Sequence, residues 1–137
     1  MSEAKVVART PVETPATPFD LVGGKSGVRS IVDRFYDLMD VDPAYQELRA
    51  LHAADLSPMR DSLTDFLMAW LGGPRDWFVQ RPGACIMSAH GKMAIDKDVA
   101  GQWIAAMDRA ISEAPVPPTL GARMSEALGG MARAMAR

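Results

Sequence analysis

Few side chains in this sequence could carry out chemistry, and they do not form one compact motif. The side chains best suited to bind a metal, attack a substrate or move a proton are His52, His90 and Cys85. Cys85 and His90 could act as a nucleophile and its base, but catalytic partners are usually distant in sequence, whereas these two are close neighbours. Cys85 is equally well interpreted as a small buried apolar residue. These residue types alone therefore do not identify a catalytic site.

Residue counts and spacing exclude several common kinds of site. Two histidines and one cysteine are too few for a structural zinc site, which takes four such ligands. A single cysteine cannot form a disulfide within the chain, which favours a reducing, cytoplasmic location. The segment Gly23-Gly24-Lys25-Ser26 lacks the first glycine and the preceding strand of a phosphate-binding loop. Asp96 and Asp98 fall at a predicted helix start, where the helix dipole alone accounts for acidic residues.

Length and composition indicate one globular domain. The chain has 137 residues, of which 48% are hydrophobic and 23% are charged. The net charge of -2 offers no concentrated basic face for nucleic acid. No apolar run approaches the ~20 residues that a membrane-spanning helix needs. We therefore expect neither a nucleic-acid partner nor insertion into a membrane.

The domain is predicted to follow a disordered N-terminal tail. Residues 1–17 combine several prolines with polar residues and show no apolar periodicity. We therefore expect the folded domain to span 18–137. Its first strong pattern places apolar residues at helical spacing on one face, namely Val28, Ile31, Val32, Phe35 and Tyr36.

The rest of the domain also shows helix patterns, and no strand pattern competes with them. Asp42-Pro43 and Ser57-Pro58 each place a capping residue before a proline, which predicts two helix starts. Asp96 is expected to cap a later helix. Apolar stripes predict helices over 59–70, 99–111 and 120–135, whereas 75–91 is expected to be irregular. The predicted fold class is therefore all-α.

One cofactor suits this set of residues. A haem needs one axial imidazole, a large apolar slot between helices and few acidic groups near its iron. His90 lies in the irregular segment between two amphipathic helices, and ten methionines supply flexible apolar side chains for such a slot. A lone histidine is nevertheless more often a structural residue, and Tyr36 and Trp103 on apolar faces are more often core residues. From residue types alone, both interpretations stay open.

Five motifs in order resemble the truncated haemoglobins, specifically group II of that family. They are Pro18-Phe19-Asp20-Leu21-Val22-Gly23-Gly24, Arg34-Phe35-Tyr36, Trp70-Leu71-Gly72-Gly73-Pro74, His90 and Trp103, and they cover residues 18 to about 112. The resemblance implies a truncated globin fold, in which two antiparallel helix pairs, B/E and G/H, form a 2-on-2 sandwich around haem b. It also implies that 75–91 replaces most of helix F, and that the Gly-Gly pairs let the chain turn sharply beside the haem.

The resemblance also implies roles for individual residues. His90 matches the proximal iron ligand, Tyr36 the distal tyrosine of helix B and Trp103 the tryptophan of helix G. His52 falls at the distal position in the loop after helix C, and a solvated loop position is its alternative. We expect His52 to supply a sixth iron ligand in part of the resting ferric protein. The residues expected to contact the cofactor are Phe35, Met59, Leu63, Phe66, Trp77, Arg81, Met87 and Lys92, of which Met59 and Leu63 match the helix E positions that face the ligand.

The segment before His90 departs from the group II pattern. Relatives usually carry an arginine-rich run there, but this chain has Gly83-Ala84-Cys85-Ile86-Met87-Ser88-Ala89. Arg81 and Lys92 are the nearest substitutes for holding the haem propionates. Trp77 aligns with an aromatic residue that is often found near a propionate.

The function implied by the resemblance is reversible binding of O2 and other diatomic ligands at ferrous haem iron. Bound O2 gains partial negative charge, so the Tyr36 hydroxyl, the Trp103 indole N–H and the His52 imidazole are the expected hydrogen-bond donors to it. Each such bond in a dry pocket is worth ~1–3 kcal/mol, so two would slow release by about 10²–10³-fold. Met59 offers no donor.

Slow release suits chemistry or sensing better than bulk oxygen transport. NO-dioxygenase-like or peroxidase-like activity would need an external reductase, so an enzymatic role stays open. NO, CO, H2O2 and sulfide are further candidate ligands, and the chain is expected to be a monomer or homodimer. The alternative from another class is a globin-fold interaction or signalling module with weak or lost haem binding, which the missing arginines favour. An unrelated helical adaptor would require every motif match to be coincidence.

Overall fold

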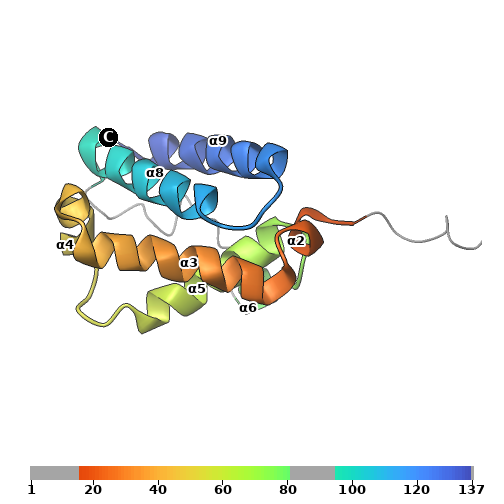
Figure 1. Cartoon of the computed structure of the whole chain (residues 1–137). Coiled ribbons are helices and arrows are strands. Elements are labelled where there is room, and N and C mark those ends of the chain that lie inside the picture. The colour runs from red at the N-terminus through yellow and green to blue at the C-terminus, as the bar shows by residue number, and fades with distance from the viewer. Residues whose placement is uncertain (1–15, 81–94, 137) are drawn as a thin grey trace, which may run out of the picture.

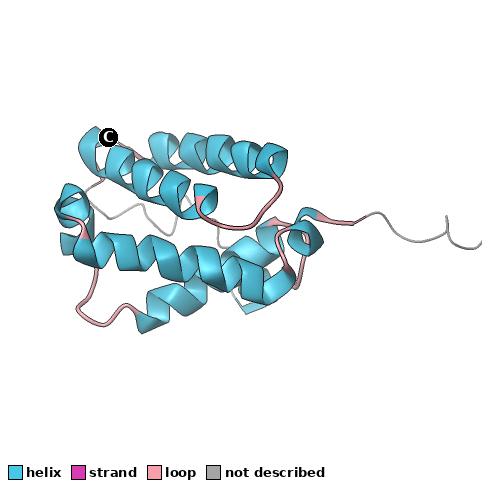
Figure 2. Ribbon diagram, in the orientation of Figure 1, coloured by secondary structure: helices cyan, strands magenta, loops and turns pink. Residues whose placement is uncertain are grey.

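The structure is a computed structural model that describes residues 16–80 and 95–136, and within these ranges every regular element is helical (Figure 2). None of the described helices is long and apolar enough to cross a bilayer. The all-α prediction is confirmed. In chain order the elements are α2 (Pro18–Leu21), α3 (Gly24–Val41), η2 (Pro43–Tyr45), α4 (Gln46–Ala50), α5 (Ser57–Trp70), α6 (Asp76–Gln80), α8 (Lys97–Ser112) and α9 (Pro118–Met135).

Two antiparallel helix pairs form the body of the domain (Figure 1). Helix α3 packs mainly against α5, and α8 packs mainly against α9. Helix α3 also packs against α8, so the two pairs are stacked on each other. This is the predicted 2-on-2 arrangement.

Helix α3 is the central element because one of its faces is entirely apolar. Val28, Ile31, Val32, Phe35 and Tyr36 are all at most 3% exposed, as the periodicity predicts. Fully burying each large apolar side chain is worth about 1.5–3 kcal/mol. Packing against both α5 and α8 therefore stabilises α3 far more than its intrinsic helix propensity does.

Two of the predicted caps are confirmed. The Asp42 side chain accepts a hydrogen bond from the Ala44 N–H at 3.0 Å and caps η2. The Asp96 carboxylate accepts one from the Val99 N–H at 2.8 Å and caps α8.

The predictions at two other helix starts need correction. Ser57 does not cap α5, because it is the first residue of that helix and its own N–H donates to the Asp55 carboxylate at 3.0 Å. Thr17, assigned to the tail, instead caps α2 through a reciprocal pair of hydrogen bonds with Asp20. Residues 1–15 of the predicted tail lie outside the described residues.

Helix α6 lies within a stretch that was expected to be irregular. Trp77, in the middle of α6, is only 4% exposed and packs edge-on against Phe66 of α5, with ring centroids 5.2 Å apart. A five-residue helix is too short to show an apolar period, so its sequence carries no helix signal. The rest of the predicted irregular stretch, from residue 81, lies outside the described residues.

In the second Gly-Gly pair, Gly73 makes room for the Phe19 ring of α2. A Cβ on Gly73 would lie 2.7 Å from the Phe19 ring, and one on Gly24 would lie 3.9 Å from it. The Phe19 N–H also donates to the Leu71 carbonyl at 2.9 Å, which holds α2 against the end of α5. The expected sharp turns are confirmed, because Gly23, Gly24 and Gly72 adopt left-handed φ angles of 100°, 66° and 96°. None of these glycines lines the cavity described below.

Candidate cofactor pocket

A cavity of about 490 Å³ lies between the helix pairs. Its volume falls within the range of about 300–1,000 Å³ that is typical of small-molecule and cofactor sites. The lining comes from α3, α4, α5, α6, α8 and α9, and from the loop that follows α4. Apolar side chains predominate, and Asp55 is the only acidic residue among the described lining residues. The lining residues named in the sequence analysis are Tyr36, His52, Met59, Leu63, Phe66, Trp77 and Trp103.

Phe35 is not among the lining residues. It is completely buried and packs edge-on against Tyr36, at 4.9 Å between ring centroids, and against Trp103, at 5.3 Å. Phe35 therefore supports the two aromatic rings of the wall from behind, and the prediction that it contacts the cofactor needs correction. The remaining predicted contacts and the predicted axial ligand lie outside the described residues, namely Arg81, Met87, Lys92 and His90.

Tyr36 brings a neutral hydroxyl to the cavity from α3. Its side chain is only 3% exposed, and this burial raises the pKa of Tyr36 to about 12 although the nearby Arg60 opposes the shift. The phenol is therefore protonated near neutral pH and can donate a hydrogen bond. Within the described part of the chain, the Tyr36 hydroxyl makes no hydrogen bond to protein.

Trp103 brings a second donor from α8, in the other helix pair. Its side chain is half-buried, and the Phe35 ring packs against it at an interplanar angle of 63°. Among the residues that the structure describes, no protein acceptor pairs with its indole N–H. Two donors from opposite helix pairs thus share one mainly apolar cavity.

His52 lies at the cavity and not in a purely solvated loop. Its ring is half-buried and stands edge-on to Tyr36, with centroids 5.9 Å apart. The Leu48 carbonyl lies 2.9 Å from Nδ1, and a carbonyl oxygen only accepts, so Nδ1 is the donor. The structure therefore favours the pocket position over the solvated alternative.

Arg49 holds the loop that carries His52. Its guanidinium donates to the carbonyl oxygens of Ala53 at 2.9 Å and Ala54 at 3.0 Å. The same side chain pairs with Asp40 of α3 at 2.6 Å, which fixes the loop to the α3–α5 pair.

Helix α9 supplies a wall of the cavity that the sequence alone did not indicate. Residues of α9 that line it share one face of the helix, namely Leu128, Met131, Ala132 and Met135. Their apolar stripe was visible in the sequence, but such a stripe predicts only a buried face. The same side chains could have packed against protein or against a cofactor.

The described residues fit a haem in two respects. The cavity is large, lies between helices and is mainly apolar, as the porphyrin ring requires. It also presents the Tyr36 and Trp103 donors without protein acceptors, so both are available to a polar ligand in the cavity. Asp55, the acidic lining residue, is exposed, and hydrogen bonds from the Ser57 N–H and hydroxyl lower its pKa.

Comparison with known proteins agrees with this architecture. A family profile described as bacterial-like globin matches residues 17–137. The chain is similar to the group II 2-on-2 haemoglobin of the plant pathogen Agrobacterium tumefaciens, with 27% identity and a TM-score of 0.87 over 91% of this chain and 97% of that one. It is also similar to the cold-adapted truncated haemoglobin of the Antarctic marine bacterium Pseudoalteromonas haloplanktis, with 29% identity and a TM-score of 0.85 over 89% and 98% of the two chains.

A group 1 truncated haemoglobin of Chlamydomonas moewusii is 33% identical over 79 residues, which are 56% of this chain and 45% of that protein. The match thus spans less than half the length of this curated relative.

Two stacked helix pairs around an apolar cavity define a truncated globin. The chain belongs to the bacterial-like globin family. The resemblance to group II truncated haemoglobins and the 2-on-2 fold are both confirmed by the solved structures. Membership of this family implies binding of haem and of small gaseous ligands.

Proposed function

We propose that this globin binds haem b in the cavity and reversibly binds O2, with Tyr36 and Trp103 donating hydrogen bonds that slow release. The observation that carries the proposal is the pair of donors from α3 and α8 that share a mainly apolar cavity. When bound, the haem iron would supply reversible coordination of a diatomic ligand. The protein's own contribution is to hold the haem, exclude water and aim the donors.

The proposed haem contacts come from both helix pairs and from α6. Leu63, Phe66 and Trp77 would pack against the porphyrin, since all three line the cavity. His90 is the proposed axial ligand. For the propionates we propose Arg81 and Lys92, and Met87 as a further contact. These last four positions lie outside the described residues, so their roles rest on the family resemblance.

The donors act through charge stabilisation in a dry environment. A neutral phenol and an indole N–H favour a ligand atom that carries partial negative charge. At ~1–3 kcal/mol per bond, losing one donor should speed release by roughly 5- to 150-fold. His52 is proposed as a third donor, and Met59, which also lines the cavity, supplies only apolar contact.

A redox role is proposed as secondary. NO, CO, H2O2 and sulfide are small enough for the same pocket, and turnover of NO or peroxide would require an external reductase. The described residues contain no group of three or more His, Cys, Asp or Glu side chains that could hold an additional metal. The single cysteine supports a reducing cytoplasmic location.

The first test is whether haem binding depends on His90. The purified wild-type protein should show a Soret band with stoichiometric haem, and His90→Ala should lose the axial imidazole signature. A wild-type protein that takes up no haemin would overturn the proposal and favour the interaction-module alternative.

The second test measures O2 dissociation for Tyr36→Phe and Trp103→Phe. Each should release O2 faster than wild type, in the range given above. Tyr45→Phe and Trp70→Phe are matched controls, because both residues contribute to the core but neither lines the cavity. If neither pocket variant speeds release, the donor assignment is wrong.

A further inference from the structure

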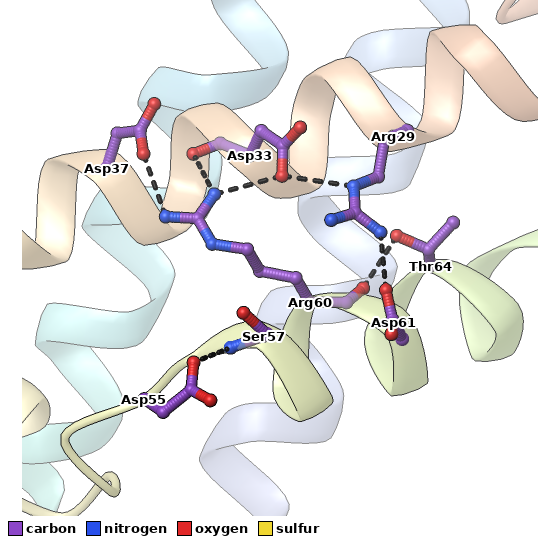
Figure 3. Close-up of polar contacts among 8 residues, drawn as sticks. All are labelled: Arg29, Asp33, Asp37, Asp55, Ser57, Arg60, Asp61 and Thr64. Atoms are coloured by element: carbon purple, nitrogen blue, oxygen red, sulfur yellow. Dashed lines mark hydrogen bonds and ion pairs between the residues drawn. The ribbon is translucent and has the colours of Figure 1, made fainter.

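Arg60 of α5 reaches across to two carboxylates of α3 (Figure 3). Its Nη1 donates to the Asp33 carboxylate at 2.9 Å and to the Asp33 carbonyl at 3.2 Å. Its Nη2 donates to the Asp37 carboxylate at 2.8 Å. Arg60 directly follows Met59 in the sequence, and Met59 lines the cavity. One guanidinium therefore joins the two helices at the level of the pocket.

The same guanidinium lies over the ring of Tyr36. Its central carbon is 5.7 Å from the ring centroid, which is within the ~6 Å range of cation–π attraction. Asp33 and Asp37 are four residues apart on α3, with Tyr36 between them. Because both carboxylates form ion pairs with the planar guanidinium, Arg60 cannot move away from the Tyr36 ring without losing these ion pairs. Only 18% of the Arg60 side chain is exposed, whereas the Asp33 and Asp37 side chains are 41% and 58% exposed.

We propose that Arg60 is a positioning residue for Tyr36, and that it holds the phenol ring in place and strengthens its hydroxyl as a hydrogen-bond donor. This inference rests on the proposed function. Arg60 does not line the cavity itself, so it would act only through Tyr36. A fixed cation beside a phenol favours loss of electron density from its oxygen, which makes the O–H a better donor. The direction agrees with the lowering effect of Arg60 on the pKa of Tyr36.

Arg29 provides a matched control between the same two helices. Its guanidinium pairs with Asp33 of α3 at 3.1 Å and with Asp61 of α5 at 2.7 Å. Arg29 thus links α3 to α5 by comparable ion pairs. It makes no ring contact with Tyr36 among the described interactions. Removing Arg29 therefore weakens the link between α3 and α5 but leaves the Arg60 guanidinium above the Tyr36 ring.

The experiment compares Arg60→Met, Arg60→Lys and Arg29→Met in the haem-loaded protein, each with and without Tyr36→Phe. Arg60→Met should speed O2 release by about three- to tenfold, which corresponds to about 0.7–1.4 kcal/mol. Arg29→Met should stay within about twofold of wild type. Arg60→Lys should lie between wild type and Arg60→Met, because it keeps the charge and loses the planar fork. In the Tyr36→Phe background the effect of Arg60→Met should disappear.

A second readout does not depend on ligand release. In protein labelled with ¹³C at the tyrosine hydroxyl-bearing carbon, Arg60→Met should shift the Tyr36 resonance, and Arg29→Met should leave it in place. The chain has two tyrosines, so Tyr45→Phe assigns the signals. If Arg60→Met and Arg29→Met have the same effect on O2 release and on the Tyr36 resonance, Arg60 only links α3 to α5 and the inference is wrong. An unchanged Tyr36→Phe release rate would instead contradict the proposed function, while the resonance would still decide the role of Arg60.

Discussion

At the scale of single residues, burial and charge act in opposition on Tyr36. Burial favours the neutral phenol, and the Arg60 guanidinium favours the phenolate, with burial dominating. Among the described interactions, none pairs the Tyr36 hydroxyl with protein, and the residue lines the cavity. The Tyr36 hydroxyl is therefore available to a ligand in the cavity. Its protonation state also affects the stability of the folded protein.

The raised pKa of Tyr36 predicts a loss of stability at alkaline pH. The pKa is about 12 in the folded protein and 10.0 for an ordinary tyrosine. Below pH 10 the Tyr36 phenol is protonated in both the folded and the unfolded state, so its ionisation does not affect the free energy of unfolding. Between pH 10 and 12 the phenol ionises only in the unfolded state, which lowers the stability of the folded protein. Wild type should therefore lose about 1.4 kcal/mol more than Tyr36→Phe between pH 9 and pH 11.

Urea unfolding of the two proteins at these pH values measures the difference. Tyr45 and the lysines are present in both proteins, so their titration cancels. Identical pH dependence in wild type and Tyr36→Phe would mean that Tyr36 is not desolvated as described.

At the scale of elements, close packing of α2 against the end of α5 depends on Gly73. Gly73→Ala should destabilise the protein by about 1–3 kcal/mol, because the new Cβ would lie 2.7 Å from Cγ and Cδ1 of Phe19. These ring atoms are close to the Phe19 main chain and cannot move away easily. Gly101→Ala in α8 is the control, since a Cβ there would meet nothing within 4 Å. That change should stabilise the protein by about 0.5–1 kcal/mol through helix propensity.

Urea or thermal unfolding of both glycine variants tests this packing. Opposite signs are expected for the two substitutions. A Gly73→Ala protein as stable as wild type would show that α2 is free to shift, and that the tight Phe19 contact is not required.

At the scale of the whole molecule, the cavity lies between the two helix pairs. Its lining joins α3, α5 and α6 on one side to α8 and α9 on the other. A bound haem would therefore contact both helix pairs and add to the cohesion of the entire domain. Without haem, the apolar side chains that line this cavity of about 490 Å³ would lack apolar partners on one side.

Removal of haem should lower the unfolding temperature. A ligand that binds only the folded state stabilises it by about 4 kcal/mol when its free concentration is about 1,000 times its Kd. Differential scanning calorimetry of the apoprotein and the haem-loaded protein measures the difference, and adding haemin back should restore the higher value. Equal unfolding temperatures for the two forms would argue that the cavity is not the haem site.

The sequence by itself determined the longer helices and the residue types of the pocket. Apolar residues on one face of 28–36 predicted the buried face of α3, because helical periodicity is a local property. Asp42 and Asp96 marked helix starts for the same reason, since a cap bonds only its own first turn. The motifs around Tyr36 and Trp103 indicated the family, and both residues line the cavity.

Only the tertiary structure decided which buried residues face the cavity and which support it. Phe35 and Tyr36 are neighbours on the same apolar face, yet Phe35 packs behind the wall and Tyr36 lines it. The closeness of Gly73 to Phe19 and of Arg60 to Tyr36 likewise joins segments far apart in the chain. A sequence pattern reports the face of a helix relative to its own axis. The residues that this face contacts depend on how helices far apart in the sequence pack together, and local spacing does not contain that information.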